Sequence, residues 1–200
     1  MSNRVSSLVA QIVELQEELE REFAKRRDAV HFSLEHGRIT FTRDVLSRHK
    51  RLKTSLLAYL RTARPLVLLT APVIYSVGIP LLLLDLFVTI YQAACFPVYG
   101  IPKVSRRDHF AYDRHRLGYL NLIEKLNCLY CSYANGLISY VREIAARTEQ
   151  YWCPIKHARK LEGIHSRYPL FVDYGDADDF AKRQEELRVA LRENAGKSHQ

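Results

Sequence analysis

Residues 117–157 read LGYLNLIEKLNCLYCSYANGLISYVREIAARTEQYWCPIKH and hold three of the four cysteines and the single tryptophan of the chain. Apolar side chains recur in this stretch every three or four residues, which is the spacing of one face of an α-helix. The stretch therefore predicts a long amphipathic helix that begins near Leu117. The apolar positions are Leu120, Ile123, Tyr130, Ala134, Leu137, Val141 and Ile144.

The same stretch holds a candidate set of metal ligands. Cys128 and Cys131 form a C-x-x-C pair, and Cys153 with His157 forms a C-x-x-x-H pair. Three thiolates and one imidazole are the ligands of a closed tetrahedral zinc site. We therefore expect a structural zinc at these four residues. Iron is the alternative metal, because thiolates also hold iron–sulfur centres.

The two pairs are difficult to bring together on one helix. If the helix is unbroken, Cys131 and Cys153 lie about 30 Å apart along its axis, whereas zinc–sulfur bonds are about 2.3 Å long. An interruption at Asn135-Gly136, an antiparallel dimer, or separate roles for the two pairs would each resolve the conflict. Pro154 suits the first turn of a further helix, which would place Cys153 and His157 on one face.

A second feature is the apolar run of residues 65–102, PLVLLTAPVIYSVGIPLLLLDLFVTIYQAACFPVYGIP, in which Asp85 is the single charged residue. A helix needs about 20 apolar residues to span a bilayer, and Pro80 favours a bend near the middle of the run. Basic residues flank the run on both sides, as they do in cytoplasmic loops. These features favour a re-entrant or two-helix membrane hairpin. A single span near residues 79–98 and a buried hairpin of a soluble protein are the alternatives.

The N-terminal third predicts two amphipathic helices. Residues 4–34 carry apolar side chains at helical spacing, which fits either packing on the protein's own core or a short coiled coil that forms a homodimer. After an extended link at residues 39–41, Thr42 is placed to cap a helix over residues 43–63 that is rich in Lys and Arg. A basic amphipathic helix beside an apolar run fits anionic lipid headgroups better than nucleic acid.

The chain as a whole has 200 residues and a formal net charge of +8. Glycine is scarce and β-branched runs are short, which favours helices over sheet. We expect an all-α fold, a helical bundle with a membrane-embedded hairpin. Its parts are the N-terminal amphipathic helices (1–64), the membrane hairpin (65–102) and a cytosolic helical Cys/His module (103–200). Since residues 1–35 lack the apolar core of a secretory signal, we expect both termini on the cytoplasmic side of the membrane.

Single polar residues give weaker indications. Asp85 fits a protonated or arginine-paired structural group at least as well as a functional one. Glu143 and Arg147 have the spacing of an ion pair on one helix face. Asp176 is placed to cap a last helix over residues 177–194.

These patterns favour a membrane-attached interaction or scaffold module that carries a structural zinc. The alternative is a membrane redox enzyme or electron carrier that uses cysteine-bound iron or reactive thiols. A lipid-modifying enzyme would instead need Glu143, Glu149 or His157 as an acid or base in one pocket. The sequence assigns no catalytic residue.

Overall fold

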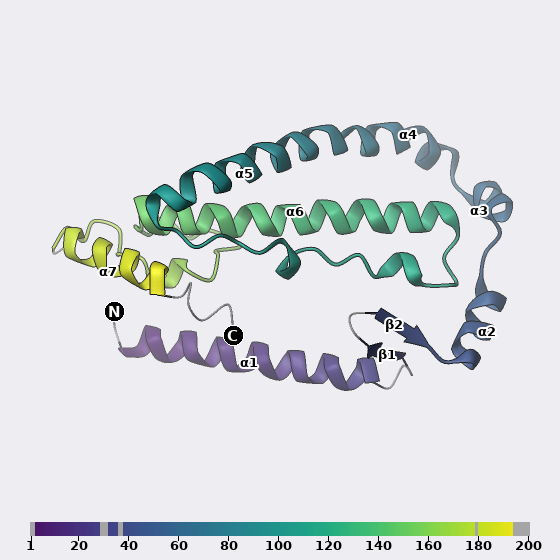
Figure 1. The fold of residues 1–200 in the computed structure, drawn as a ribbon, viewed down its shortest axis with the longest axis horizontal. Helices are drawn as coiled ribbons and strands as arrows, with labels where there is room; N and C mark the ends of the chain where they lie inside the picture. Colours follow the sequence, from purple (N-terminus) through teal and green to yellow (C-terminus); the bar gives the residue numbers. More distant parts are fainter. Residues whose placement is uncertain (1–2, 29–31, 36–37, 179, 194–200) are drawn as a thin grey trace. The chain divides into compact units, whose positions relative to one another are not determined.

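The computed structural model describes residues 3–28, 32–35, 38–178 and 180–193 (Figure 1). These residues are mainly helical, and the strands among them form a single two-stranded hairpin. The prediction of an all-α fold is confirmed at this level. The chain forms two compact units, Met1–Ala71 with Tyr112–Cys131 and Pro72–Ala111 with Ser132–Gln200.

In the first unit, helix α1 (Asn3–Asp28) is followed by an antiparallel hairpin of β1 (Phe32–Glu35) and β2 (Arg38–Phe41). The expected helix over 4–34 is therefore wrong at its C-terminal end. Residues from Phe32 onward are in β1, where the backbone hydrogen-bonds to the neighbouring strand in place of the helix. The extended link expected at residues 39–41 is confirmed as part of β2.

The predicted basic helix over residues 43–63 is divided into α2 (Arg43–Leu52) and α3 (Leu56–Thr62). Ser55 causes the division because its side-chain oxygen accepts a hydrogen bond from the backbone N–H of Ala58 at 3.2 Å. This contact caps the start of a new helix. Thr42 occupies the N-cap position of α2 as expected, although its side chain makes no capping hydrogen bond there.

Helices α4 (Pro65–Ser76) and α5 (Gly78–Tyr99) follow one another as one helical stretch of 35 residues. Among the described residues, this is the stretch that is long and apolar enough to cross a membrane, judged by length and composition. The chain does not fold back between the two helices (Figure 1), so the predicted hairpin is not established. Pro80 lies in the first turn of α5, where the missing N–H has no partner to lose and no sharp bend is required.

Helix α6 (Leu122–Trp152) begins five residues later than the apolar pattern indicated. Its start is set by a reciprocal capping contact between Asn121 and Glu124. The Asn121 side-chain oxygen accepts from the backbone N–H of Glu124 at 3.0 Å, and the Glu124 carboxylate accepts from the backbone N–H of Asn121 at 2.8 Å. Such a capping box satisfies two helix-terminal donors at once.

Gly136 does not interrupt α6, which is unbroken through this position. A Cβ atom at Gly136 would lie 2.8 Å from the ring of Phe110 and 3.0 Å from the backbone oxygen of His109. The glycine therefore allows the segment before α6 to approach the helix closely. The helix break that the Asn-Gly pair suggested is wrong, because the missing side chain is used for packing.

The core of the second unit lies between α5 and α6. Phe96 of α5 and Tyr140 of α6 are almost fully buried and belong to one hydrophobic cluster. Helix α7 (Phe180–Glu193) adds Leu191 to it, and the segment that follows α5 adds Ile101 and Val104. In Figure 1, α5 and α6 run alongside each other.

The chain after α6 is extended, so the helix expected after Pro154 is wrong. The backbone N–H of Val172 donates to the Pro154 oxygen at 2.8 Å, and the N–H of Lys156 donates to the Val172 oxygen at 2.8 Å. These bonds join two strand-like segments in parallel at Ile155. The last helix is confirmed, but it begins at Phe180 and not at residue 177, so Asp176 does not lie at its N-cap. The Asp176 carboxylate instead accepts from Arg183 at 2.6 Å.

The capping contact of α6 generates a first prediction. Replacing Asn121 with Ala removes the acceptor of the Glu124 N–H and should lower the free energy of unfolding by about 1 kcal/mol. Chemical denaturation followed by circular dichroism measures this change. Glu124→Gln keeps an acceptor for the Asn121 N–H, so its free energy of unfolding should fall by less than that of Asn121→Ala. An Asn121→Ala protein as stable as the wild type would show that the cap contributes nothing.

Candidate functional site

The four predicted metal ligands do not converge within the chain. Cys128 and Cys131 lie one turn apart on α6, while Cys153 directly follows the end of that helix. Cys153 is 22 residues after Cys131, so the unbroken helix separates them by about 33 Å. Among the described residues, no group of three or more His, Cys, Asp or Glu side chains could hold a metal ion.

His157 is held by Tyr168. Its backbone N–H donates to the Tyr168 hydroxyl at 2.6 Å, and the two rings stack at 14° with their centroids 6.2 Å apart. The segment from Cys153 to His157 is extended, so these two residues do not share a helical face. One chain therefore offers the pair Cys128 and Cys131 without the other two expected ligands beside it.

Asp85 of α5 is an arginine-paired structural group, as one of the two interpretations of the sequence expected. Its two carboxylate oxygens accept from the guanidinium of Arg106 at 2.6 and 2.9 Å, and one of them accepts from the Tyr133 hydroxyl at 3.0 Å. The same guanidinium lies 4.6 Å from the ring centre of Phe110 and 5.1 Å from that of Tyr140. These contacts fix the segment after α5 against both helices.

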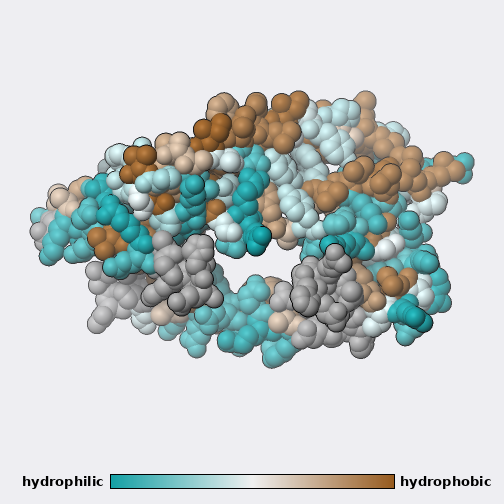
Figure 2. Space-filling model, viewed as in Figure 1, coloured by the Kyte–Doolittle hydropathy of each residue, from teal (hydrophilic) through white to brown (hydrophobic). Residues whose placement is uncertain are grey.

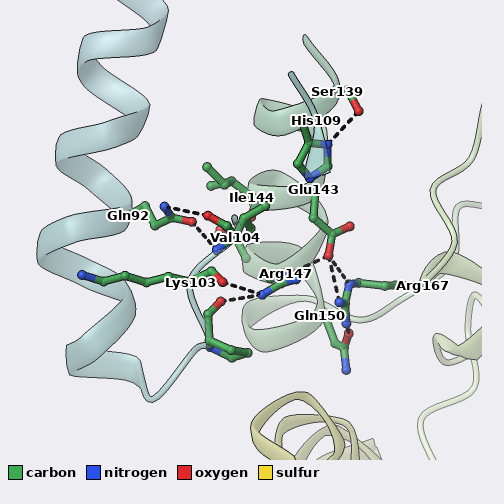
Figure 3. A network of polar contacts seen from close by, with 12 residues as sticks. Gln92, Lys103, Val104, His109, Ser139, Glu143, Ile144, Arg147, Gln150 and Arg167 are labelled. Atoms are coloured by element: carbon green, nitrogen blue, oxygen red, sulfur yellow. Dashed lines mark hydrogen bonds and ion pairs between the residues drawn. The ribbon is translucent and has the colours of Figure 1, made fainter. Parts of the chain in front are cut away.

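Gln92 is the second polar residue of α5 that faces inward. Its amide donates to the Tyr140 hydroxyl at 2.7 Å, and its oxygen accepts from the backbone N–H of Val104 at 2.7 Å (Figure 3). The side chain is buried, so both of its polar ends need partners. Gln92 thus satisfies the backbone of the segment that crosses between α5 and α6.

Glu143 of α6 is the centre of a second ionic group. The carboxylate accepts from Arg147 at 2.8 Å, which confirms the pair expected from the sequence, and from Arg167 at 2.9 Å. Arg147 also donates to the backbone oxygen of Pro102 at 2.7 Å, and Arg167 donates to the Gln150 side chain at 2.9 Å. In Figure 3 the two arginines approach Glu143 from opposite sides. Glu143 therefore links the segments before and after α6 to the helix.

This environment keeps Glu143 ionised. Burial alone would raise the pKa of the carboxyl group, but hydrogen bonds and charges from Arg147 and Arg167 outweigh it and lower the pKa below its ordinary value. A carboxyl group with a lowered pKa is a poor proton donor near neutral pH. Glu143 thus serves as a structural anion in this arrangement.

A pocket of about 380 Å³ opens between α5 and α6 in the second unit. The Glu149 carboxylate, which also lines the pocket, accepts from the ring of His165 at 2.9 Å. Thr148 of α6 lies 3.0 Å from the Tyr91 hydroxyl, so these two polar side chains are also paired. The apolar lining of the pocket comes from Val88, Tyr91, Val141, Ile144, Ala145 and Trp152.

The outer face of α5 is apolar and uncovered. Its large side chains follow helical spacing, and Ile79 and Phe87 are 64% and 67% exposed. Figure 2 shows hydrophobic side chains gathered over α5 and the adjoining end of α4. The opposite face of α5 supplies Gln92 and Phe96 to the interior. The exposed face, called the outer face below, consists of Ile79, Leu82, Leu83, Leu86, Phe87 and Ile90.

Comparison with known proteins found no matching family model, no matching curated protein and no matching solved structure. The chemistry of the site therefore rests on its own geometry.

Sequence reasoning did not predict the polar contacts that Gln92, Arg106 and Arg167 make with α5 and α6. Gln92 gave one usable signal, because an amide within an apolar run is costly to bury unless it is hydrogen-bonded. Arg106 and Arg167 lie in irregular segments whose paths no periodicity describes. Their pairing with Asp85 and Glu143 depends on how the chain returns to α6.

The ionic group at Glu143 predicts an acid-dependent loss of stability. Because the folded-state pKa is lowered, its stabilising contribution is complete above the unfolded pKa near 4.5 and is lost as the pH falls through the folded value. At pH 7, Glu143→Gln should lower the free energy of unfolding by about 1–3 kcal/mol because two partly buried guanidiniums lose their anion. Denaturation curves at pH 7 and pH 3 should differ less for the variant than for the wild type.

The matched control for that experiment is Glu185→Gln on α7. Glu185 is exposed and pairs with Arg188 and Arg192 at 3.4 and 3.7 Å. An exposed pair contributes about 1 kcal/mol or less, so this variant should remain close to the wild type at both pH values. An equal decrease in the free energy of unfolding of the two variants would contradict the central role of Glu143.

The positions of the cysteines generate a third prediction. Because α6 separates the two pairs, Cys128→Ser and Cys153→Ser should change the free energy of unfolding independently, each by about 1 kcal/mol or less. Metal analysis of the monomeric protein, purified without an affinity tag, should find no zinc that both substitutions remove. One zinc for each chain, lost in either variant of a monomeric protein, would contradict this geometry.

Proposed function

We propose that the protein is a membrane-attached interaction or scaffold module, held on one leaflet by the outer face of α5. The observation that carries this proposal is the exposure of six large apolar side chains on a helix whose other face is packed. A soluble protein rarely leaves so large a contiguous apolar surface uncovered. The most apolar window of the α4–α5 stretch is 0% buried, unlike the core helix of a soluble protein.

The size of this surface is sufficient for attachment. Burying one large apolar side chain fully contributes about 1.5–3 kcal/mol. The six side chains of the outer face are partly exposed, so their transfer into lipid contributes on the order of 5–10 kcal/mol before the entropic cost of binding. A contribution of this size supports reversible membrane binding, as a single acyl anchor does, and a second contact with the membrane would strengthen it.

The charges on α6 favour attachment along the membrane surface over a transmembrane arrangement. Arg142 is exposed and lies two residues from buried Tyr140 and Ile144, so it occupies the opposite side of the helix from α5. A span by α5 would draw α6 and this charge into the hydrocarbon, at a cost of about 3 kcal/mol or more for each charged group. With α5 in the plane of the interface, the charges on α6 stay in water.

The first unit supports the same attachment through a different chemistry. No residue of α2 or α3 is buried, and both helices carry exposed leucines, including Leu46, Leu52 and Leu57. Their basic residues would contact anionic headgroups, each with an affinity contribution of about 1 kcal/mol. These residues are Arg43, Arg48, Lys50, Arg51, Lys53 and Arg61.

An interaction module fits the interior of the second unit better than an enzyme does. The charged groups Asp85 and Glu143 are each paired with arginines that fasten neighbouring segments. The redox alternative would use the thiols of Cys128 and Cys131, which are one turn apart on α6. We propose the scaffold, and a zinc held by all four expected ligands would then be shared between two chains.

Vesicle flotation tests the proposal. Leu83→Glu combined with Leu86→Glu places two carboxylates on the outer face and should reduce vesicle binding at least tenfold, because each charge must stay hydrated. The matched control is Ile138→Glu, which changes an exposed apolar side chain of α6 away from that face. The control should bind as the wild type does. Equal binding by the double variant and the wild type would refute attachment through α5.

Attachment to one leaflet also places both ends of the chain on one side of the membrane. Protease added outside sealed vesicles should therefore remove tags from both termini when the protein is bound from outside. Protection of one tag would favour a single span.

A further inference from the structure

We propose that the pocket between α5 and α6 binds one acyl chain of a membrane phospholipid. This inference rests on the proposed attachment, since the pocket must face lipid to receive the chain. Its volume of about 380 Å³ lies within the range of about 300–1,000 Å³ that is typical of ligand sites. The lining of the pocket, its shape and the position of its opening indicate which ligand it would bind.

The lining favours an apolar occupant. The hydroxyls of Tyr91 and Thr148 lie 3.0 Å apart, and Thr148 donates to the Ile144 backbone oxygen at 2.8 Å. Glu149 is paired with His165 at 2.9 Å. These polar groups are already bonded within the protein, so a ligand has no need to supply partners. What remains for it is the apolar surface of Val88, Val141 and Ala145.

The shape favours a linear chain over a compact ring. The pocket is lined along α6 from Val141 to Trp152, a distance of about 16 Å along the helix axis. It is bounded on the other side by α5 at Val88 and Tyr91 and is open to the surface. An open groove that extends along α6 suits one extended hydrocarbon chain.

The opening continues the outer face of α5. Phe87 belongs to that face, and Tyr91 of the pocket lies four residues later, one turn along the same side of the helix. Leu84, which is partly exposed, precedes Phe87 by three residues and lies on the same flank. A lipid that contacts the outer face therefore reaches the pocket without crossing a polar surface.

An aromatic group at one end of the pocket indicates where the headgroup would lie. Trp152 packs edge-on against Tyr99 and Tyr151 with centroid distances of 5.3 and 5.1 Å, and the guanidinium of Arg188 lies 4.7 Å from the ring centre of Tyr151. Tryptophan and tyrosine concentrate at the level of lipid headgroups. The polar end of the lipid would thus lie near Trp152, with its chain directed toward Val141.

Trp152 also gives a direct readout, because it is the single tryptophan of the chain. The probe is a phosphatidylcholine dibrominated near the carboxyl end of one acyl chain, the part that would lie beside Trp152, and it is added in mixed micelles to the full-length protein, with the unbrominated lipid as the reference. Bromine quenches tryptophan fluorescence on contact. We expect quenching that saturates near one lipid for each chain. Quenching that rises without saturation would reflect the micelle alone and would overturn the pocket.

A substitution within the pocket tests the assignment. Ala145→Phe fills the groove and should raise the half-saturating lipid concentration at least tenfold, while the matched control Ile138→Phe, outside the pocket, should leave it unchanged. An unchanged value in Ala145→Phe would overturn the proposal. If Ala145→Phe loses its helical signal, Val141→Phe on the same wall replaces it. Mass spectrometry of the wild type should also find co-purified phospholipid, which needs no variant.

The failure of this inference can be distinguished from failure of the proposed attachment. Vesicle binding that depends on Leu83 and Leu86, without saturable quenching, would overturn the pocket and leave the attachment standing. Quenching by free dibromostearate but not by the phospholipid would overturn the phospholipid as the occupant. Saturable quenching blocked by Ala145→Phe would support the pocket even if the Leu83→Glu, Leu86→Glu protein still bound vesicles, a result that would refute attachment through α5.

Discussion

The packing of α5 on α6 is the contact on which the rest of the second unit depends. Phe96 of α5 meets Leu137, Tyr140 and Ile144 of α6 in a cluster where each side chain is almost fully buried. Burial of four such side chains contributes on the order of 5–10 kcal/mol, which is comparable to the net stability of a small domain. Only one face of α5 takes part in this contact, and the opposite face is exposed on the surface of the unit. That division of one helix into two apolar faces underlies both the fold and the proposed attachment.

Charged residues fasten the irregular segments to this helix pair. Arg106 joins the segment after α5 to Asp85, and Arg167 joins the segment after α6 to Glu143. Because each pair is partly buried, the loss of one partner leaves the other charge unsatisfied, which costs more than an exposed ion pair. In the proposed attachment, the same pairs would restrict the orientation of the protein on a bilayer. They lie on α5 and α6 close to the core, where immersion in hydrocarbon would be costly.

The sequence predicted the helices far better than it predicted their ends and connections. Apolar periodicity located α1, α6 and α7, because a helix that buries one face repeats its apolar residues every three to four positions. The stretch of α4 and α5 was recognised by its long apolar run, although a hairpin was expected there. The ends depended on local contacts that periodicity does not contain, such as the Asn121–Glu124 capping box and the Ser55 cap. The sequence left a helix break at Gly136 open because glycine marks either a break or a close contact, and only the position of Phe110 distinguishes the two.

The candidate site was predicted only in part for a related reason. Glu143 and Arg147 are neighbours in sequence, so their pairing follows from helix geometry alone. The pocket, Arg106 and Arg167 depend on contacts between segments far apart in the chain. The expected zinc site illustrates the limit most clearly, since correct ligand types at correct local spacing still require the chain to bring both pairs together. The unbroken α6 does not do so within one chain.

The most direct test of the account is a nitroxide scan of α5 from residue 79 to residue 90 in vesicle-bound protein. Oxygen and a water-soluble nickel complex report the depth of each label in the bilayer. Attachment by the outer face predicts that depth rises and falls with the helical period, with maxima near Leu83, Leu86 and Ile90 at similar values. A depth that changes steadily along the helix whatever the face would show that α5 spans the membrane, and labels that remain in water throughout would show that α5 does not contact it.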